Sequence, residues 1–138
     1  MEFSFILIED CELDCFIARK IIAHTDKSIV VKSFQNARLV FDDIINNPVN
    51  DPDVINIILL DLQMPIMDGF QFAEEFEKLP PETQKQYRIV VLSSTRNATD
   101  ILRILTFNCI NSLVEKPLTF EKLFSLILQL QPGAESSN

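Results

Sequence analysis

The stretch Ile55-Asn56-Ile57-Ile58-Leu59-Leu60 is almost entirely apolar and rich in β-branched side chains. A second run of this kind, Ile89-Val90-Val91-Leu92, follows further along the chain. Short apolar runs that do not alternate with polar residues are typical of strands buried on both faces, and such strands belong to parallel sheets covered by helices. The two runs therefore predict the centre of a parallel sheet.

Segments of strand length alternate with segments of helical spacing along the rest of the chain. The predicted strands are Phe3–Ile8, Ile29–Phe34, Val54–Leu60, Ile89–Leu92 and Ile110–Val114. Two apolar stripes at helical spacing lie between them, formed by Leu13, Phe16, Ile17 and Ile21 and by Phe72, Ala73, Phe76 and Leu79. Five strands alternating with five helices predict an α/β fold, a doubly wound sandwich with right-handed crossovers.

Polar residues mark the expected helix starts and loops. Asp68, with Gln71 three residues later, predicts a capping box, and Asn97 and Thr119 are expected to cap the last two helices. The stretches Asn46 to Asp53 and Pro80 to Thr83 are expected to be surface loops.

Composition excludes several classes of function. The chain has 138 residues, 47% of them hydrophobic, and a net charge of −8, which argues against binding to nucleic acid or to an anionic membrane. Two glycines cannot build a glycine-rich phosphate loop, and the single histidine excludes two-histidine metal sites. An acidic N-terminus and three cysteines, an odd number, predict a cytoplasmic protein with reduced thiols.

Charged and hydroxyl side chains follow four of the five predicted strands. Glu9 and Asp10 follow the first strand, Asp61 the third, Ser93 and Ser94 the fourth, and Lys116 the fifth. Because parallel strands end at one edge of the sheet, these side chains are expected to converge there. Three carboxylates packed together repel one another, and a hard divalent cation relieves that repulsion. Mg²⁺ with oxygen ligands is the predicted occupant.

Four segments resemble the receiver domain of two-component response regulators. They are Glu9-Asp10, Leu60-Asp61-Leu62-Gln63-Met64-Pro65-Ile66-Met67-Asp68-Gly69, Leu92-Ser93-Ser94 and Lys116-Pro117. The resemblance runs from about Phe5 to Leu128 and implies a flavodoxin-like sheet of strand order 2-1-3-4-5. We expect residues 1–130 to form one stand-alone receiver domain, residues 131–138 a flexible tail, and no output domain.

The resemblance also implies a role for each site residue. Asp61 would accept a phosphoryl group from a sensor histidine kinase or a histidine phosphotransfer protein, and Lys116 and Ser93 would contact that group. Asp10, Asp61 and the backbone carbonyl of Gln63 would bind Mg²⁺ directly, and Glu9 would bind it through water. The chain would assist its own phosphorylation and dephosphorylation without being an enzyme. It would signal by a conformational change to a downstream protein target that the sequence does not name. Lys116-Pro117 would form a cis-proline turn.

Three positions depart from the common pattern of these domains. Glu9 stands where Asp is more frequent, and Gln63 occupies a position that tunes dephosphorylation in the family. Leu113 stands where many receivers carry the aromatic ring of their conformational switch. Ser94 is an alternative to Ser93 as the hydroxyl that contacts the phosphoryl group.

Other proteins built on similar chemistry fit the sequence less well. A flavodoxin would carry a glycine- and hydroxyl-rich phosphate loop where this chain has Glu9 and Asp10. A haloacid-dehalogenase-type phosphohydrolase needs a second acid two residues after the nucleophile, and Gln63 stands there. A pseudo-receiver, which keeps the fold as a binding module without taking phosphate, is the remaining alternative.

Overall fold

The computed structural model describes residues 2–47, 51–62, 67–94 and 97–130. Its strands are β1 (Glu2–Ile8), β2 (Val30–Phe34), β3 (Val54–Asp61), β4 (Tyr87–Ser93) and β5 (Ile110–Glu115). They form one parallel sheet of order β2-β1-β3-β4-β5. The predicted doubly wound α/β fold and strand order are therefore confirmed.

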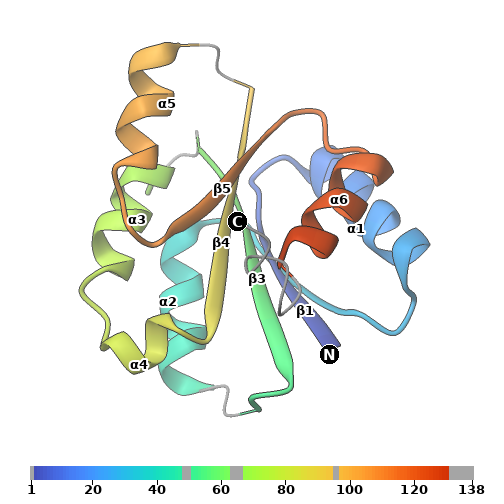
Figure 1. The fold of residues 1–138 in the computed structure, drawn as a ribbon, viewed down its shortest axis with the longest axis horizontal. Helices are drawn as coiled ribbons and strands as arrows, with labels where there is room; N and C mark the ends of the chain where they lie inside the picture. Colours follow the sequence, from blue (N-terminus) through green and yellow to red (C-terminus); the bar gives the residue numbers. More distant parts are fainter. Residues whose placement is uncertain (1, 48–50, 63–66, 95–96, 131–138) are drawn as a thin grey trace.

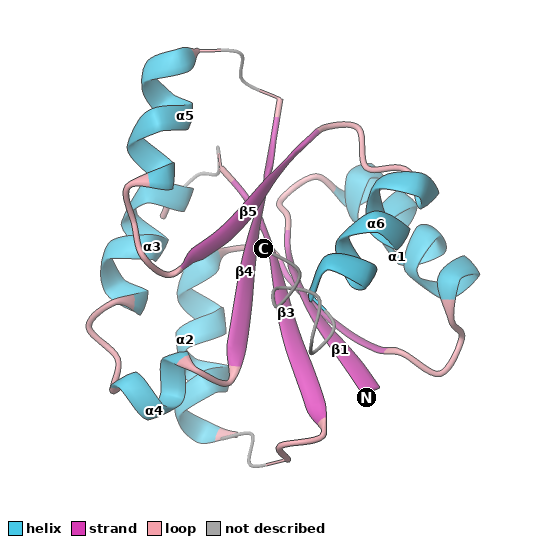
Figure 2. Cartoon of the chain, in the orientation of Figure 1, coloured by secondary structure: helices cyan, strands magenta, loops and turns pink. Residues whose placement is uncertain are grey.

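Helices cover both faces of the sheet, as Figures 1 and 2 show. They are α1 (Glu12–Thr25), α2 (Ala37–Asn46), α3 (Gly69–Phe76), α4 (Pro81–Gln84), α5 (Ala98–Leu105) and α6 (Phe120–Leu130). The side chains of α1 and α6 pack with those of the central strands on one face. The side chains of α2, α3 and α5 do so on the other face. Central strand β3 is buried from Ile55 to Asp61, as its apolar sequence predicts.

One predicted loop contains a helix. Pro80 to Thr83 were expected to be a surface loop, but Pro81–Gln84 form the single helical turn α4. Pro81 occupies the first position of that turn, where the proline ring presets a helical φ angle and its missing N–H has no partner to lose. The alternation of strands and helices is therefore interrupted once, between α3 and β4.

Helix α1 buries a different face from the one its apolar stripe suggests. Ala18 and Ile22 face the sheet, whereas Leu13 and Phe16 are 65% and 58% exposed. Apolar residues cover more than one flank of this helix, and the small Ala18 lets its backbone approach the strands closely. Most of the eleven phenylalanines belong to the core or pack against it. Four are buried, namely Phe5, Phe70, Phe72 and Phe76, and four more are half-buried against the core clusters, namely Phe3, Phe34, Phe41 and Phe107.

The predicted helix caps are present. Asp68 and Gln71 form a capping box at α3, and the Asn97 side chain accepts the backbone N–H groups of Thr99 and Asp100. Thr119 Oγ1 accepts the backbone N–H of Lys122 in the first turn of α6. Within the described part of the chain, no helix has both the length and the apolar composition needed to cross a bilayer.

Candidate functional site

The sheet register brings the predicted site residues to one edge. Ile8 pairs with Leu60, so Glu9 and Asp61 come next on two neighbouring strands. The strand ladder continues through the site, because the Glu9 backbone N–H donates to Phe34 O at 3.1 Å. Ser93, the last residue of β4, pairs with Glu115. The backbone therefore fixes where each of these side chains starts.

Three carboxylates gather at this edge. Oxygen atoms of Glu9, Asp10 and Asp61 all lie within 4.8 Å of one another. Glu9 and Asp61 are buried, with 5% and 8% of their surface exposed, whereas Asp10 is exposed. A buried charge needs a partner of opposite sign, so the cluster requires a cation.

Lys116 is the cation that the protein itself supplies. Its Nζ lies 3.0 Å from Glu9 Oε2 and 3.3 Å from Asp61 Oδ2. The Lys116 backbone N–H donates to Ser93 O at 2.8 Å, which ties the turn after β5 to the end of β4. The Lys116–Pro117 peptide bond is cis, as predicted. Lys116 therefore lies next to the carboxylate that sequence reasoning assigns as phosphoacceptor.

The pKa values of Glu9 and Lys116 are both raised, from different causes. Burial raises the pKa of Glu9 to about 7; the hydrogen bond from Lys116 opposes this rise, and the charge of Asp61 adds to it. Burial alone would lower the pKa of Lys116. Its hydrogen bond to Glu9 and the charge of Asp61 outweigh burial, so this pKa lies above its ordinary value. Lys116 therefore stays protonated as the counter-ion of the cluster.

The donor set fits a magnesium ion. Mg²⁺ prefers hard oxygen ligands and keeps several waters, and this site offers carboxylate oxygens from three residues, one of them exposed to solvent. Receiver domains typically bind Mg²⁺ at an acidic pocket of this kind. The fourth predicted ligand, the backbone carbonyl of Gln63, lies outside the described residues.

Gly69 lets the start of α3 approach the end of β3. A Cβ atom at Gly69 would lie 2.9 Å from Leu62 Cδ1 and 3.0 Å from Leu62 Cα. The Gly69 backbone N–H donates to Leu62 O at 2.9 Å. A side chain at position 69 would collide with Leu62, which explains why glycine stands at this position of the motif.

The two candidate hydroxyls differ in burial. Ser93 is 2% exposed at the end of β4, whereas Ser94 is exposed. Ser94 and Lys116 line a cavity of about 320 Å³. Ile17 and Ala18 of α1 and Leu118 also line this cavity. Leu113 is half-buried on β5 and packs against the apolar cluster beneath α2, α3 and α5.

Sequence reasoning missed two residues that contact this site. Asp14, in the first turn of α1, places Oδ2 3.6 Å from Lys116 Nζ. Lys122, on α6, donates from Nζ to the carbonyl oxygens of Glu115 at 2.7 Å and of Pro117 at 2.9 Å. Neither contact has a local sequence signal, because each forms only when the turn around Lys116 packs against α1 or α6.

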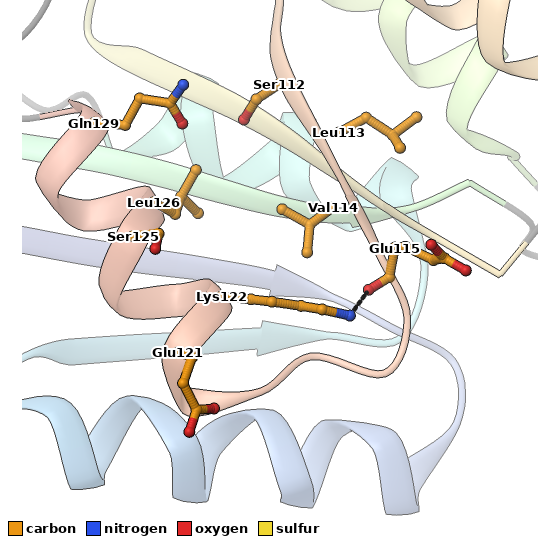
Figure 3. Close-up of a pocket in the computed structure, with 9 residues that line it drawn as sticks. All are labelled: Ser112, Leu113, Val114, Glu115, Glu121, Lys122, Ser125, Leu126 and Gln129. Carbon is orange, nitrogen blue, oxygen red and sulfur yellow. Dashed lines mark hydrogen bonds between the residues drawn. The ribbon is translucent and has the colours of Figure 1, made fainter.

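A second, more open hollow of about 430 Å³ runs along β5 and α6. Figure 3 shows Lys122 extending through it toward the backbone of Glu115, with Ser112 and Gln129 at the other end. Its lining includes the acids Glu115 and Glu121 and the cation Lys122.

Comparisons with known proteins agree with this geometry. The sequence profile of the response regulator receiver domain matches residues 5–128. A solved response regulator receiver protein from Dyadobacter fermentans is 30% identical, with a TM-score of 0.79 over 92% of this chain and 95% of that chain. A two-component response regulator from Cytophaga hutchinsonii has the same fold, at 22% identity and a TM-score of 0.79 over 93% of this chain and 96% of that chain.

A longer protein also carries a related segment. The signal transduction histidine-protein kinase BarA of Escherichia coli (strain K12) is 30% identical over 83 residues, which cover 60% of this chain. The matched segment spans 9% of the length of that kinase.

The parallel sheet of order 2-1-3-4-5, with an acidic cluster and a lysine at its carboxyl edge, defines a receiver-type phosphoacceptor domain. The chain belongs to the response regulator receiver domain family. Its class is therefore that of signalling domains of two-component systems, which interact with histidine kinase phosphodonors.

Proposed function

We propose that Asp61 accepts a phosphoryl group from the phosphohistidine of a histidine kinase or histidine phosphotransfer protein. An Asp61 carboxylate oxygen attacks phosphorus, the P–N bond to the donor imidazole breaks, and the imidazole nitrogen takes up a proton. The product is an aspartyl phosphate and a neutral histidine. The observation that supports this most directly is the Lys116 ammonium 3.3 Å from Asp61 Oδ2, at the end of a buried strand.

Lys116 and Ser93 act on the transferred group in this proposal. The Lys116 ammonium leaves Glu9 and pairs with a phosphoryl oxygen, so it neutralises charge that develops during transfer. The Ser93 hydroxyl donates a hydrogen bond to another phosphoryl oxygen. Its place as the last residue of β4 favours it over Ser94, which lies one residue further out and is exposed.

Glu9, Asp10 and Asp61 would hold Mg²⁺, with Glu9 acting through a water molecule. When bound, the ion neutralises phosphoryl charge and relieves the repulsion among the carboxylates. Asp10, which is exposed, would be accessible to an ion that enters from solvent. Glu9 would hold the hydrated ion in place of its present contact with Lys116.

The phosphodonor protein docks on α1 in this proposal. Leu13, Phe16 and Ile17 are 65%, 58% and 42% exposed, an unusual apolar surface for a helix next to a charged site. Asp14, between Leu13 and Phe16 in the sequence, contacts Lys116, so this surface borders the reacting groups.

The phosphorylated form then binds a downstream protein. The three free thiols support a cytoplasmic location.

Incubation with acetyl phosphate tests the central step. Purified protein with acetyl phosphate and MgCl₂ is expected to gain the mass of one phosphoryl group, and borohydride reduction followed by peptide mass spectrometry should locate it at Asp61. Chelation of Mg²⁺ by EDTA should suppress the gain. Absence of any mass gain in folded wild-type protein would favour a pseudo-receiver that binds partners without taking phosphate.

The docking surface has its own test. Once a kinase that labels the protein has been found by phosphotransfer profiling, Phe16→Ser should slow transfer from that kinase and leave labelling by acetyl phosphate unchanged. Phe124→Ser removes another exposed ring, on α6, and serves as the control. A Phe16→Ser protein that accepts phosphate from the kinase at the wild-type rate would place the contact elsewhere than on α1.

A further inference from the structure

The turn that carries Lys116 joins an edge strand to the last helix. It begins where edge strand β5 ends, at Glu115, and leads into α6 four residues after Lys116. On the sheet side, the Lys116 backbone N–H donates to Ser93 O. The Lys116 side chain starts from this short backbone segment, so restraint of the segment limits where the ammonium can lie, in addition to its ion pairs with Glu9 and Asp61.

Lys122 fixes the segment from the helix side. Its ammonium donates to two backbone carbonyls, those of Glu115 at 2.7 Å and Pro117 at 2.9 Å. These carbonyls belong to the residues immediately before and after Lys116. Figure 3 shows the Lys122 side chain extended from the first turn of α6 along the hollow, with its ammonium at Glu115.

Both hydrogen bonds are of the stronger kind, because the donor is charged. The base of Lys122 is held as well, since its backbone N–H donates to Thr119 Oγ1 at 3.2 Å. A surface lysine ordinarily keeps its flexible ammonium in water. Here the ammonium, although its hydrogen bonds are exposed, links α6 to the backbone on both sides of Lys116.

We propose that Lys122 is a positioning residue for Lys116. It restrains residues 115–117 so that the Lys116 ammonium stays within 3.0–3.3 Å of Glu9 and Asp61, ready to meet the phosphoryl group. The inference rests on the proposed function, because it assigns Lys122 to the same phosphoryl-transfer site. Lys122 does not touch the reacting atoms, so it acts through the geometry of Lys116.

The expected effect is on the rate of transfer at saturation. Lys122→Met keeps the length of the side chain and removes its donors, and it should lower the maximal rate of phosphorylation by acetyl phosphate about three- to tenfold at saturating Mg²⁺. The half-saturating donor concentration should change less than the maximal rate. Lys122→Arg can still donate to two carbonyls and should restore the rate to within about twofold of wild type.

Lys78→Met is the matched control. Lys78 is an exposed lysine paired with Glu75 just beyond α3, so this variant loses the same charge without touching the turn. It should phosphorylate at the wild-type rate. A Lys122→Met protein with the wild-type maximal rate, or one slowed no more than Lys78→Met, would overturn the proposal.

A second measurement does not depend on phosphorylation. Relaxation of the ¹⁵Nζ nucleus of Lys116 reports the order of its ammonium, which should decrease in Lys122→Met and be retained in Lys122→Arg and Lys78→Met. If wild-type protein takes no phosphate, the proposed function fails and this measurement alone decides the role of Lys122. Unchanged order of Lys116 in a folded Lys122→Met protein would contradict it.

Discussion

The carboxylate side and the β5 side of the site are built in opposite ways. On the carboxylate side, Glu9 and Asp61 are buried at the ends of central strands and are locked to Lys116 by short ion pairs. On the β5 side, Leu113 is a half-buried aliphatic residue, and no residue of the strand is fully buried. Strand β3, by contrast, is buried along seven of its eight residues.

This difference in burial suggests that phosphoryl transfer and the conformational response to it take place in different parts of the site. Burying several charges costs stability unless they are paired, and Lys116 supplies that pairing for Glu9 and Asp61. The buried carboxylates Glu9 and Asp61 therefore lie at the ends of the central strands β1 and β3. An edge strand with weak apolar contacts can shift at small cost, so a conformational signal is expected to pass through β5.

Removing the phosphoacceptor tests the carboxylate side most severely. Asp61→Asn should abolish labelling by acetyl phosphate, because a neutral amide is not a competent nucleophile. The near-isosteric side chain should keep the melting temperature within about 3 °C of wild type. Mass spectrometry and a thermal melt measure the two outcomes. Undiminished incorporation of phosphate would overturn the assignment of Asp61.

The second largest effect is expected from Mg²⁺ binding, measured as a change in thermal stability. At about ten times its dissociation constant, Mg²⁺ should stabilise the wild-type protein by about 1.4 kcal/mol, or about 4 °C in melting temperature. Asp10→Ala should remove most of this increment, whereas Asp42→Ala, at an exposed acid on α2, should retain it. A wild-type melting temperature that does not respond to millimolar Mg²⁺ would argue against the acidic cluster as a magnesium site.

The sequence predicted the carboxylate side well because its signals are local. Apolar runs place the strands, and the residue after each run must lie at the edge of a parallel sheet. Asp68 and Asn97 were predicted as caps for the same reason, since a cap bonds to backbone groups within three residues.

What the sequence did not predict depends on contacts between distant segments. Periodicity shows that α1 is apolar, but only packing against the sheet selects Ala18 and Ile22 over Phe16. Asp14 resembles any acid in a first helical turn, and Lys122 resembles any surface lysine. Their contacts arise only once the turn around Lys116 is folded against α1 and α6.

Asp14 provides a smaller test of the carboxylate side. Its carboxylate competes with the phosphoryl group for Lys116 and repels an anionic donor. Asp14→Asn should therefore lower the half-saturating concentration of acetyl phosphate about threefold, and the difference should shrink at high salt. Glu12→Gln removes the same charge from the same turn and is the control. An equal effect of both variants would reduce the role of Asp14 to general charge.

The smallest effect is expected on the β5 side. Leu113 pairs with Val91, two residues before Ser93. It therefore lies on the strand next to the one that carries the Ser93 hydroxyl. Lacking a ring, it changes less apolar surface when it moves, a difference on the order of 1 kcal/mol relative to an aromatic residue. Amide chemical shifts caused by beryllofluoride, an acyl-phosphate mimic, should therefore be larger from Asn97 to Asp100 than in α6.

Leu113→Phe sharpens this last comparison. The added ring gives β5 more apolar area to bury or expose, so beryllofluoride should shift the amides of α6 about twofold more than in wild type. Leu113→Met changes shape without adding a ring and should behave like the wild type. Wild-type shifts in α6 as large as those from Asn97 to Asp100 would show that the aliphatic residue transmits the signal fully. The carboxylate side and the β5 side would then differ in charge but not in their response to phosphorylation. Strand β5 would change conformation as strongly as a strand that carries an aromatic switch residue.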